Sequence, residues 1–401
     1  MRTRHSLLTA TLFGAVLLAN AAAPSAAHAA AAVAPPAPAA AMPVPPPPAV
    51  PTRAYALLDV ASNQVLAAMN ENQRMEPASL TKLMTAYVVF HALEDGKLKL
   101  EQEVPISEYA WRTGGAKSGG STSFLDLGSR VRVVDLIQGM IVQSGNDASI
   151  ALAEAVAGNE ATFAVLMNQH AKRLGMTGTN WTNSPGLPDP NQYTTARDLA
   201  ILCGAIIREF PQYYRWYSQR EFTFNGITQR NRNGLLDRDP SVDGIKTGHT
   251  SSAGYNLASS SFRNGMRLVS VVMGSDGFRT REDASAALLG YGFSFFESRR
   301  LYRAGQQVGT TTVFKFGDPI NVVVRRDLVA TAPRGQFANV RAQLILNPRL
   351  VAPLAANQPI GKVRVSMGDR VIAELPAFPQ QAVEPGNVFR RLIDTVRLWL
   401  A

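Results

Sequence analysis

Cysteine is almost absent from this 401-residue chain, which contains a single one, Cys203. One cysteine cannot form an intramolecular disulfide, so the fold must be stabilised by its core, and 46% hydrophobic residues allow a sizeable one. Cys203 lies in the apolar helical pattern of residues 200–206. This position favours a buried structural thiol over a reactive one.

Lysine is also scarce, since only eight of the 40 basic residues are Lys and the others are Arg. The 30 acidic residues leave a formal net charge of +10, and no run of five basic residues occurs. Charge that is spread in this way does not indicate nucleic-acid binding. It is compatible with attraction to anionic envelope surfaces or to acidic substrates.

The five histidines show no metal-ligand spacing, and His5 and His28 lie in the N-terminal leader. We expect His91 and His170 to be helix-surface or core residues. The sequence therefore predicts no metal ion and no cofactor.

The N-terminus has the order of a secretory signal peptide. A basic start, residues 1–5, precedes the short apolar run 6–18 and the A-x-A cleavage site at residues 27–29. The apolar run is too short to span a bilayer comfortably, so we assign residues 1–29 to a signal peptide. Residues 30–52 are almost entirely Ala, Pro and Val and are expected to form a linker.

Hydrophobic periodicity predicts an α+β domain over residues 53–300. Its expected hairpins span residues 53–69 and 255–273, the second turning at Asn264-Gly265. Its expected helices span residues 80–93, 133–142, 147–156, 194–207 and 283–296. Because strands occur at both ends of this unit, we expect them to share one antiparallel sheet.

The C-terminal part has a different pattern. Short strands at residues 322–324, 340–346, 363–365 and 371–375 predict a small, β-sandwich-like domain over residues 301–380. Residues 385–401 form an amphipathic pattern with Arg390, Arg391 and Arg397 on the polar face. This segment suits a helix lying on a membrane surface, and a helix docked on its own protein is the alternative.

Ser79-Leu80-Thr81-Lys82 places a hydroxyl and an amine on one face of a helix. A serine is a poor nucleophile unless a base takes its proton. Lys82 can be that base if its pKa is lowered, and we expect burial and Lys246 to lower it. Taken alone, the motif reads equally well as a helix-cap Ser followed by a surface Lys.

Two further motifs follow in the chain. Ser144-Gly145-Asn146 offers a second hydroxyl and an amide between two helices, and Lys246-Thr247-Gly248 offers a second cation on a strand. Lys246 can bind an anionic substrate end, and Gly248 is expected to let a substrate backbone approach the strand edge. S-x-x-K, S-x-N and K-T-G in this order are typical of the penicillin-recognising serine enzymes.

From residue 53 to its end, the chain resembles a low-molecular-mass penicillin-binding protein of the D-alanyl-D-alanine carboxypeptidase family, of the penicillin-binding protein 5 type. The supporting stretches are residues 77–82, 144–148, 231–236, 242–250 and 290–297. The resemblance implies a β-lactamase/transpeptidase-like catalytic domain that removes terminal D-alanine from peptidoglycan stem peptides. It also implies covalent inhibition by β-lactams and attachment to the periplasmic face of the inner membrane through the C-terminal helix.

The resemblance implies catalytic roles for individual residues. Ser79 would be the acylated nucleophile and Lys82 its general base. Ser144 and Lys246 would relay a proton to the leaving group, and Asn146 would hold amide groups of the substrate.

It implies binding roles for others. The backbone N–H groups of Ser79 and His249 would form the oxyanion hole. Thr247 and Arg232 would take the terminal carboxylate of the substrate, next to Gly248.

Three alternative functions stay open. A class A β-lactamase would carry a deacylating Glu in the stretch 183–191, which has none, and an Asp in place of Gly145. A peptidoglycan endopeptidase would use the same motifs but generally lacks a C-terminal domain. A non-catalytic wall-binding protein would have no need of the nucleophile, base and relay.

Overall fold

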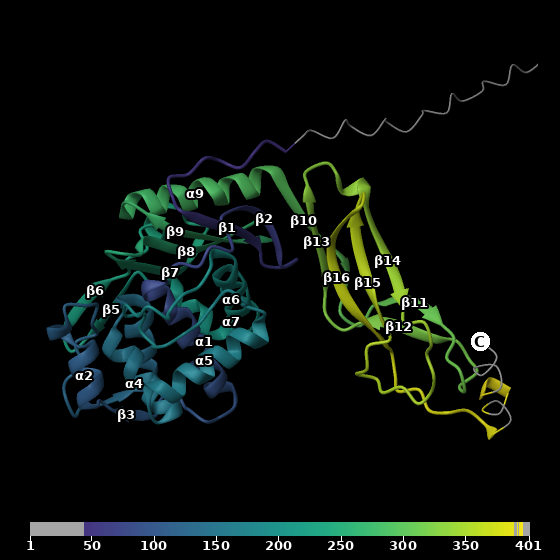
Figure 1. Ribbon diagram of the computed structural model, residues 1–401, viewed down its shortest axis with the longest axis horizontal. Coiled ribbons are helices and arrows are strands. Elements are labelled where there is room, and N and C mark those ends of the chain that lie inside the picture. The colour runs from purple at the N-terminus through teal and green to yellow at the C-terminus, as the bar shows by residue number, and fades with distance from the viewer. Residues whose placement is uncertain (1–43, 389–390, 392, 396–401) are drawn as a thin grey trace, which may run out of the picture. The chain divides into compact units, whose positions relative to one another are not determined.

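The computed structural model describes residues 44–388, 391 and 393–395 (Figure 1). The predicted signal peptide, the first part of the predicted linker and most of the predicted terminal helix lie outside these residues.

A five-stranded antiparallel sheet forms the centre of the larger domain, in the order β2-β1-β9-β8-β7. Strand β1 pairs with β2, its hairpin partner, and also with β9, where Ala54 lies opposite Met273. The first and last strands of the domain are therefore neighbours, which confirms the prediction of one shared antiparallel sheet. The strands are β1 (Ala54–Asp59), β2 (Gln64–Met69), β7 (Val242–Thr250), β8 (Gly254–Arg263) and β9 (Met266–Ser275).

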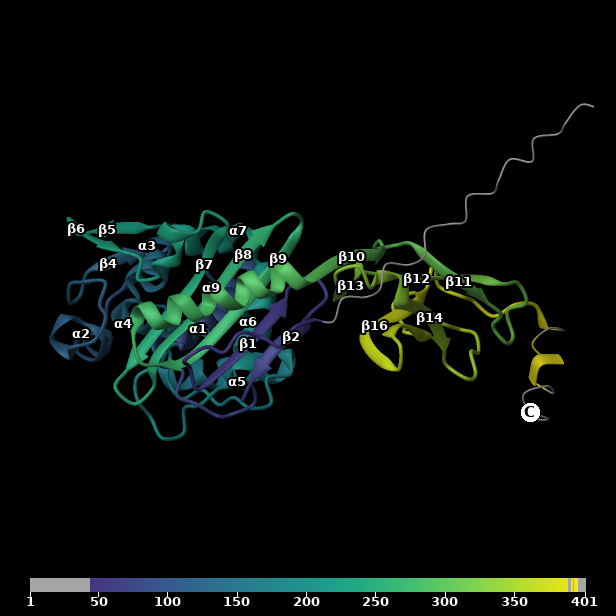
Figure 2. The ribbon, with the colours of Figure 1, turned by 90° about the horizontal axis from the view of Figure 1, so that it is seen from above.

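Alternate side chains of the sheet enter two different cores, because successive residues of a strand point to opposite faces. In β1, Ala56 and Leu58 pack into the helical core, whereas Tyr55 and Leu57 pack against the core of α9 (Phe278–Phe295). All six residues of β1 are consequently buried. Figures 1 and 2 show α9 on one face of the sheet and the other helices on the opposite face.

The helical layer follows the predicted order, with elements that the sequence did not reveal between them. Its members are α1 (Lys82–Glu94), α2 (Glu108–Gly114), α3 (Val133–Gln138), α4 (Asn146–Ala157), α5 (Glu160–Leu174), α6 (Ala196–Glu209) and α7 (Pro211–Tyr214). Two small hairpins, β3–β4 (Glu103–Pro105, Arg130–Arg132) and β5–β6 (Glu221–Phe224, Ile227–Arg230), and the short α8 (Leu235–Arg238) complete the domain. Cys203 is fully buried in α6, as predicted.

Helix α9 begins five residues before its predicted start. Its first turns contain Arg281 and Glu282, which are buried although they are charged. These two charged residues interrupt the apolar periodicity on which the prediction depended. The predicted start at Asp283 was therefore wrong.

The C-terminal domain is all-β, as predicted, and has its own hydrophobic core. Its main sheet has the order β11-β12-β16-β15-β14, and β10 pairs with β13 in a separate ladder. The strands are β10 (Phe296–Tyr302), β11 (Gln307–Thr311), β12 (Ile320–Val324), β13 (Leu328–Pro333), β14 (Val340–Leu346), β15 (Gly361–Met367) and β16 (Arg370–Pro379).

The end of the predicted linker contacts the larger domain. Val44 and Val50 pack against the core of α9, and the Tyr291 hydroxyl donates a hydrogen bond of 2.9 Å to the carbonyl of Pro45. Proline-rich chain can do this without regular structure because its own backbone needs few partners.

Asp59 connects the end of β1 to the ladder of β10 and β13. One carboxylate oxygen accepts the backbone N–H groups of Ala61 and Ser62, at 2.8 and 3.1 Å. The other accepts the hydroxyls of Ser298 and Thr331. Asp59 is fully buried, so all of these bonds are shielded from water.

Replacing Asp59 with Ala should lower the free energy of unfolding by about 3 kcal/mol, because four donors lose a charged acceptor in a buried place. D59N should lower the free energy of unfolding by less, since the hydroxyls of Ser298 and Thr331 can rotate and accept hydrogen bonds from the new amide. Urea unfolding of the three proteins, followed by circular dichroism, measures both effects. Equal stability of D59A and the unmodified protein would show that Asp59 does not hold this junction.

Candidate active site

A cavity of about 200 Å³ opens beside β7 and collects residues from all three sequence motifs. Ser79, Ser144, Thr247, Gly248, His249 and Arg232 line it, as do three residues that the sequence did not single out: Ser121, Tyr255 and Arg281. Of the other predicted residues, Lys82, Asn146 and Lys246 are buried.

Ser79 and Lys82 lie within reach of each other, as predicted. Ser79 belongs to a short 3-10 turn, Ala78–Thr81, and Lys82 is the first residue of α1. Lys82 Nζ lies 3.1 Å from Ser79 Oγ, 2.7 Å from Asn146 Oδ1 and 2.6 Å from the Pro185 carbonyl oxygen. A neutral amine has two N–H donors and one lone pair. With the donors used by Asn146 and Pro185, the lone pair would face Ser79 Oγ.

Lys82 is only 1% exposed. Burial, the largest cause, and the charge of Arg232 together lower the pKa of Lys82 to about 7, against the opposing effect of Asp147. The predicted effect of burial is confirmed, and the repulsion between the two lysines lowers the pKa of Lys246. Burial, Lys82, Arg232 and Arg281 lower the pKa of Lys246 well below its usual value.

The S-x-N motif turns sharply between two helical segments. Ser144 has a left-handed φ of 63° after the π-turn Gly139–Gln143. A Cβ at Gly145 would lie 2.1 Å from Ser123 Oγ, so a larger residue would require the Ser123 side chain to move. The Asp147 carboxylate fixes that facing segment by accepting the Thr122 hydroxyl at 2.7 Å and the Ser123 N–H at 2.8 Å. Glycine in the middle of the motif thus leaves room for the Ser123 side chain.

The K-T-G motif lies on β7, at the edge of the sheet. A Cβ at Gly248 would lie 2.9 Å from the Pro77 carbonyl oxygen and 3.2 Å from the Ser79 nitrogen. The missing side chain thus lets β7 pack against the turn that carries Ser79, whereas we had expected it to make room for substrate. His249 is exposed, and its ring packs on Tyr255 with 4.1 Å between centroids.

One end of the cavity is cationic. Arg232 Nη1 donates to Ser121 Oγ at 2.7 Å, and Arg281 lies behind it with only 5% of its surface exposed. Burial lowers the pKa of Arg281 to about 10, and its guanidinium lies 5.6 Å from the centre of the Tyr255 ring.

A helical stripe could have revealed Arg281. The buried residues of α9 recur at helical spacing, and the same spacing extended towards the N-terminus reaches position 281: Ala284, Ser285, Leu288, Leu289 and Gly292. A charged residue at the end of such a stripe is a candidate for a functional site. Ser121 and Tyr255 carry no comparable signal.

The loop that supplies the Pro185 carbonyl is held from both sides. Glu160 Oε1, from α5, accepts the N–H and the hydroxyl of Ser184 at 2.9 and 2.6 Å, and its other oxygen accepts the Tyr109 hydroxyl at 2.7 Å. The Thr85 hydroxyl donates to the Ser184 carbonyl at 2.6 Å. A carboxylate therefore lies next to this loop, but both of its oxygens accept hydrogen bonds that hold the loop in place.

His91 and His170 stack on each other, with 4.7 Å between ring centroids, on α1 and α5. Burial lowers the pKa of His170 to about 4. Within the described part of the chain, no three His, Cys, Asp or Glu side chains are grouped so that they could hold a metal ion.

Comparison with known proteins agrees with this geometry. The family model of D-alanyl-D-alanine carboxypeptidases, peptidase family S11, matches residues 40–277. The model of the C-terminal domain of penicillin-binding protein 5 matches residues 296–385.

Individual relatives cover most of the chain. D-alanyl-D-alanine carboxypeptidase DacA of Haemophilus influenzae is 44% identical over 86% of this chain and 88% of its own length. The protein of the same name from Escherichia coli K12 is 42% identical over 87% and 88%. The crystal structure of penicillin-binding protein 5 from Haemophilus influenzae superposes with a TM-score of 0.77 and 43% identity, over 84% of this chain and 99% of that one. The chain therefore belongs to the D-alanyl-D-alanine carboxypeptidases of peptidase family S11.

Proposed function

We propose that this protein is a serine carboxypeptidase that removes the terminal D-alanine from peptidoglycan pentapeptides and is acylated by β-lactams. The observation that carries the proposal is the buried Lys82 amine, which lies 3.1 Å from Ser79 Oγ. The relatives of this chain that are named D-alanyl-D-alanine carboxypeptidases support it. Lys82 has a pKa near neutrality because it is buried, so a large fraction of it is available as a base.

Acylation begins when Ser79 Oγ attacks the carbonyl carbon of the penultimate D-alanine. The hydroxyl proton passes to Lys82 Nζ, and the N–H groups of Ser79 and His249 stabilise the oxyanion. The proton taken up by Lys82 is passed through Ser144 and Lys246 to the departing amine nitrogen as the C–N bond breaks, so D-alanine leaves, Lys82 is neutral again and an ester remains on Ser79. Water then hydrolyses the ester and restores the serine hydroxyl.

The substrate would bind as an extended peptide along β7. This strand lies at the edge of its sheet, where unpaired backbone groups can accept an added strand. The terminal carboxylate would enter the cationic end of the cavity, where Arg232 and Arg281 lie near Thr247. Asn146 would hold an amide of the substrate through its side-chain nitrogen, since Lys82 already occupies its oxygen.

The alternatives have less support. A β-lactamase needs a free carboxylate to activate the deacylating water, and both oxygens of Glu160 already accept hydrogen bonds. The match of residues 296–385 argues against an endopeptidase without this domain. A non-catalytic wall protein would not need a lysine buried at the cost of its charge.

We also propose that the signal peptide directs the protein to the periplasm and that residues 385–401 attach it to the inner membrane. In the part of the chain that the structure describes, no single helix is long and apolar enough to cross a membrane, although the bent pair α4 and α5 together meets that test by length and composition. Asp394 accepts the Lys315 N–H of the β domain at 2.7 Å. That contact favours the docked alternative for this part of the tail.

The rate of acylation should fall as the pH drops through about 7. Below its pKa, Lys82 is an ammonium and cannot accept the Ser79 proton. The acidic limb of the pH–rate profile should therefore follow the neutral fraction of Lys82. Stopped-flow acylation with a fluorescent β-lactam measures the limb. R232Q should move it to higher pH by removing a cation, whereas R232K should leave it in place. A rate that is unchanged between pH 8 and about 5.5 would contradict the role of Lys82.

Benzylpenicillin should add once to the intact protein, at Ser79, and stay long enough to be seen by mass spectrometry. S79A should form no adduct and should lose about 10³-fold or more of its D-Ala-D-Ala hydrolysis, because no nucleophile remains. S366A in the β domain is the matched control. Rapid consumption of penicillin without a lasting adduct would instead favour a β-lactamase.

Deleting residues 385–401 should reduce the membrane-bound fraction of the protein and leave its turnover of a soluble peptide unchanged, because the site is built from residues before 282. Fractionation of cells that express each form measures the difference. If both forms distribute equally, the tail is a docking element of the β domain.

A further inference from the structure

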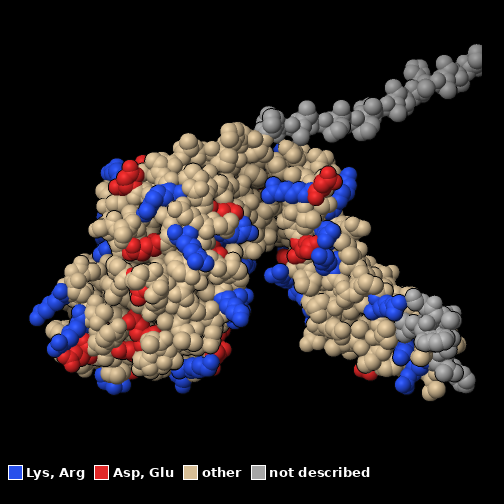
Figure 3. Space-filling view, in the orientation of Figure 1, with Lys and Arg blue, Asp and Glu red and all other residues tan. Residues whose placement is uncertain are grey.

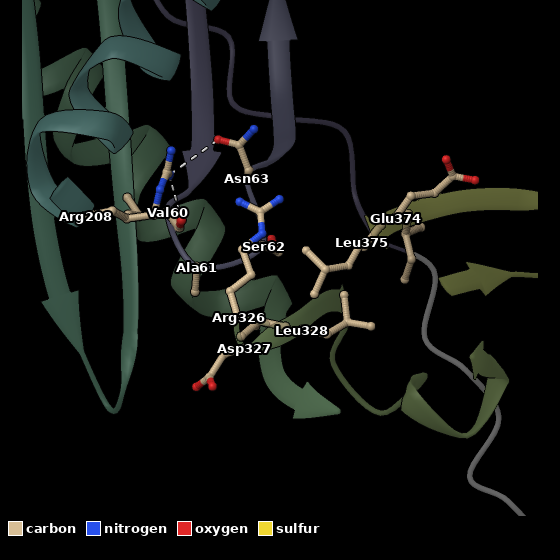
Figure 4. Close-up of a pocket in the computed structure, with 13 residues that line it drawn as sticks. Val60, Ala61, Ser62, Asn63, Arg208, Arg326, Asp327, Leu328, Glu374 and Leu375 are labelled. Atoms are coloured by element: carbon tan, nitrogen blue, oxygen red, sulfur yellow. Dashed lines mark hydrogen bonds between the residues drawn. The ribbon is translucent and has the colours of Figure 1, made fainter. Parts of the chain in front are cut away.

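A second cavity, of about 560 Å³, lies where the turn after β1 faces the β domain (Figure 4). Residues 60–63, Arg208 of α6, residues 326–329 and residues 372–375 of β16 line it. None of these residues belongs to the cavity that contains Ser79. A hydrogen bond of 2.7 Å between the hydroxyls of Ser62 and Thr331, in which Ser62 can donate, holds the two sides together next to it.

Two arginines face this cavity without a carboxylate partner among the described residues. Arg208 Nη1 contacts only neutral oxygens, the Val60 carbonyl at 3.0 Å and Asn63 Oδ1 at 3.5 Å. Arg326 has no ion pair in the described part of the chain. Figure 4 shows both guanidinium groups on the side of the cavity near Asn63.

The carboxylates that line the cavity are already paired elsewhere. Asp327 forms an ion pair of 2.9 Å with Arg300. Glu374 pairs with Lys362 at 2.9 Å and with Arg364 at 2.6 Å. The cavity therefore has two uncompensated positive charges.

These two charges disfavour each other. Desolvation lowers the pKa of Arg208, Glu209 opposes this shift, and the nearby Arg326 lowers the pKa further. An arginine stays charged under all ordinary conditions, so an anion between the two guanidinium groups would relieve the repulsion. A dianion would balance both guanidinium groups, and phosphate matches their fork of N–H donors.

The remaining walls suit a ligand larger than a free ion. Asn63 and Ser62 add neutral polar groups next to the arginines, and Leu328 and Leu375 border the cavity on another side (Figure 4). Its volume lies within the range that holds small organic ligands.

We propose that this cavity binds a phosphate group, either free or carried by a small organic molecule, between Arg208 of the larger domain and Arg326 of the β domain. The site is independent of the chemistry at Ser79. Its occupation would connect the two domains through one anion.

Isothermal titration of the full-length mature protein at constant ionic strength tests this proposal, with inorganic phosphate, hexyl phosphate and succinate as probes. We expect saturable binding of phosphate and at least about tenfold weaker binding to R326A, because one charge-assisted contact is lost. R349A is the control, because it removes an exposed arginine of the β domain that lies outside the cavity. This variant should bind phosphate as tightly as the unmodified protein does. Hydrolysis of D-Ala-D-Ala should be the same in all three proteins.

The probes separate the sources of the phosphate. Tighter binding of hexyl phosphate would indicate an organic phosphate that uses the apolar wall, and equal binding would indicate inorganic phosphate. No saturable binding, equal losses in R326A and R349A, or succinate binding as tightly as phosphate would each overturn the proposal.

Discussion

The burial of the Lys82 amine is the constraint on which the rest of the site depends. A buried ammonium is costly, and the group lowers that cost by giving up its proton and by contacting oxygens from three segments of the chain. Those segments are the turn of Ser79, the start of α4 and the loop of Pro185. Their positions are set by partners further away, Asp147 and Glu160, so the chemistry at Ser79 is supported by a shell of carboxylates that do not react.

Glycine makes this convergence sterically possible. At positions 186 and 248, an added Cβ would lie 1.9 and 2.9 Å from backbone oxygens of the facing segment, so these two glycines let one backbone approach another. At position 145, an added Cβ would lie 2.1 Å from the Ser123 hydroxyl oxygen, so this glycine makes room for a side chain. The charged side chains are spread over the surface. Figure 3 shows basic groups scattered among acidic and neutral ones on the face in view, so the cationic end of the active site is a local feature.

Much of the fold and the site could be predicted from the sequence because the signals are local. The three motifs, the shared sheet and the separate β domain follow from spacing and periodicity, and the contact of Ser79 with Lys82 follows from helical geometry. Arg281, Ser121 and the Glu160 anchor could not be predicted with the same ease, because each functions through contacts with segments distant in sequence. The effect of burial on the pKa of Lys82 could be predicted, but the contribution of Arg232 could not, because the proximity of charges in space is not visible in the order of residues.

The pairing of Ala54 with Met273 has a consequence for how the chain acquires its structure. Strand β1 cannot pair on its second edge until β9 has been made. Bringing the two strands together restricts the long segment between them, residues 60–265, at a large cost in conformational entropy. Nascent chains that stop before residue 266 lack the strand that covers β1 on its second edge. Folding of this domain is consequently a late event in synthesis, because β1 lacks one of its two neighbours until β9 has been made.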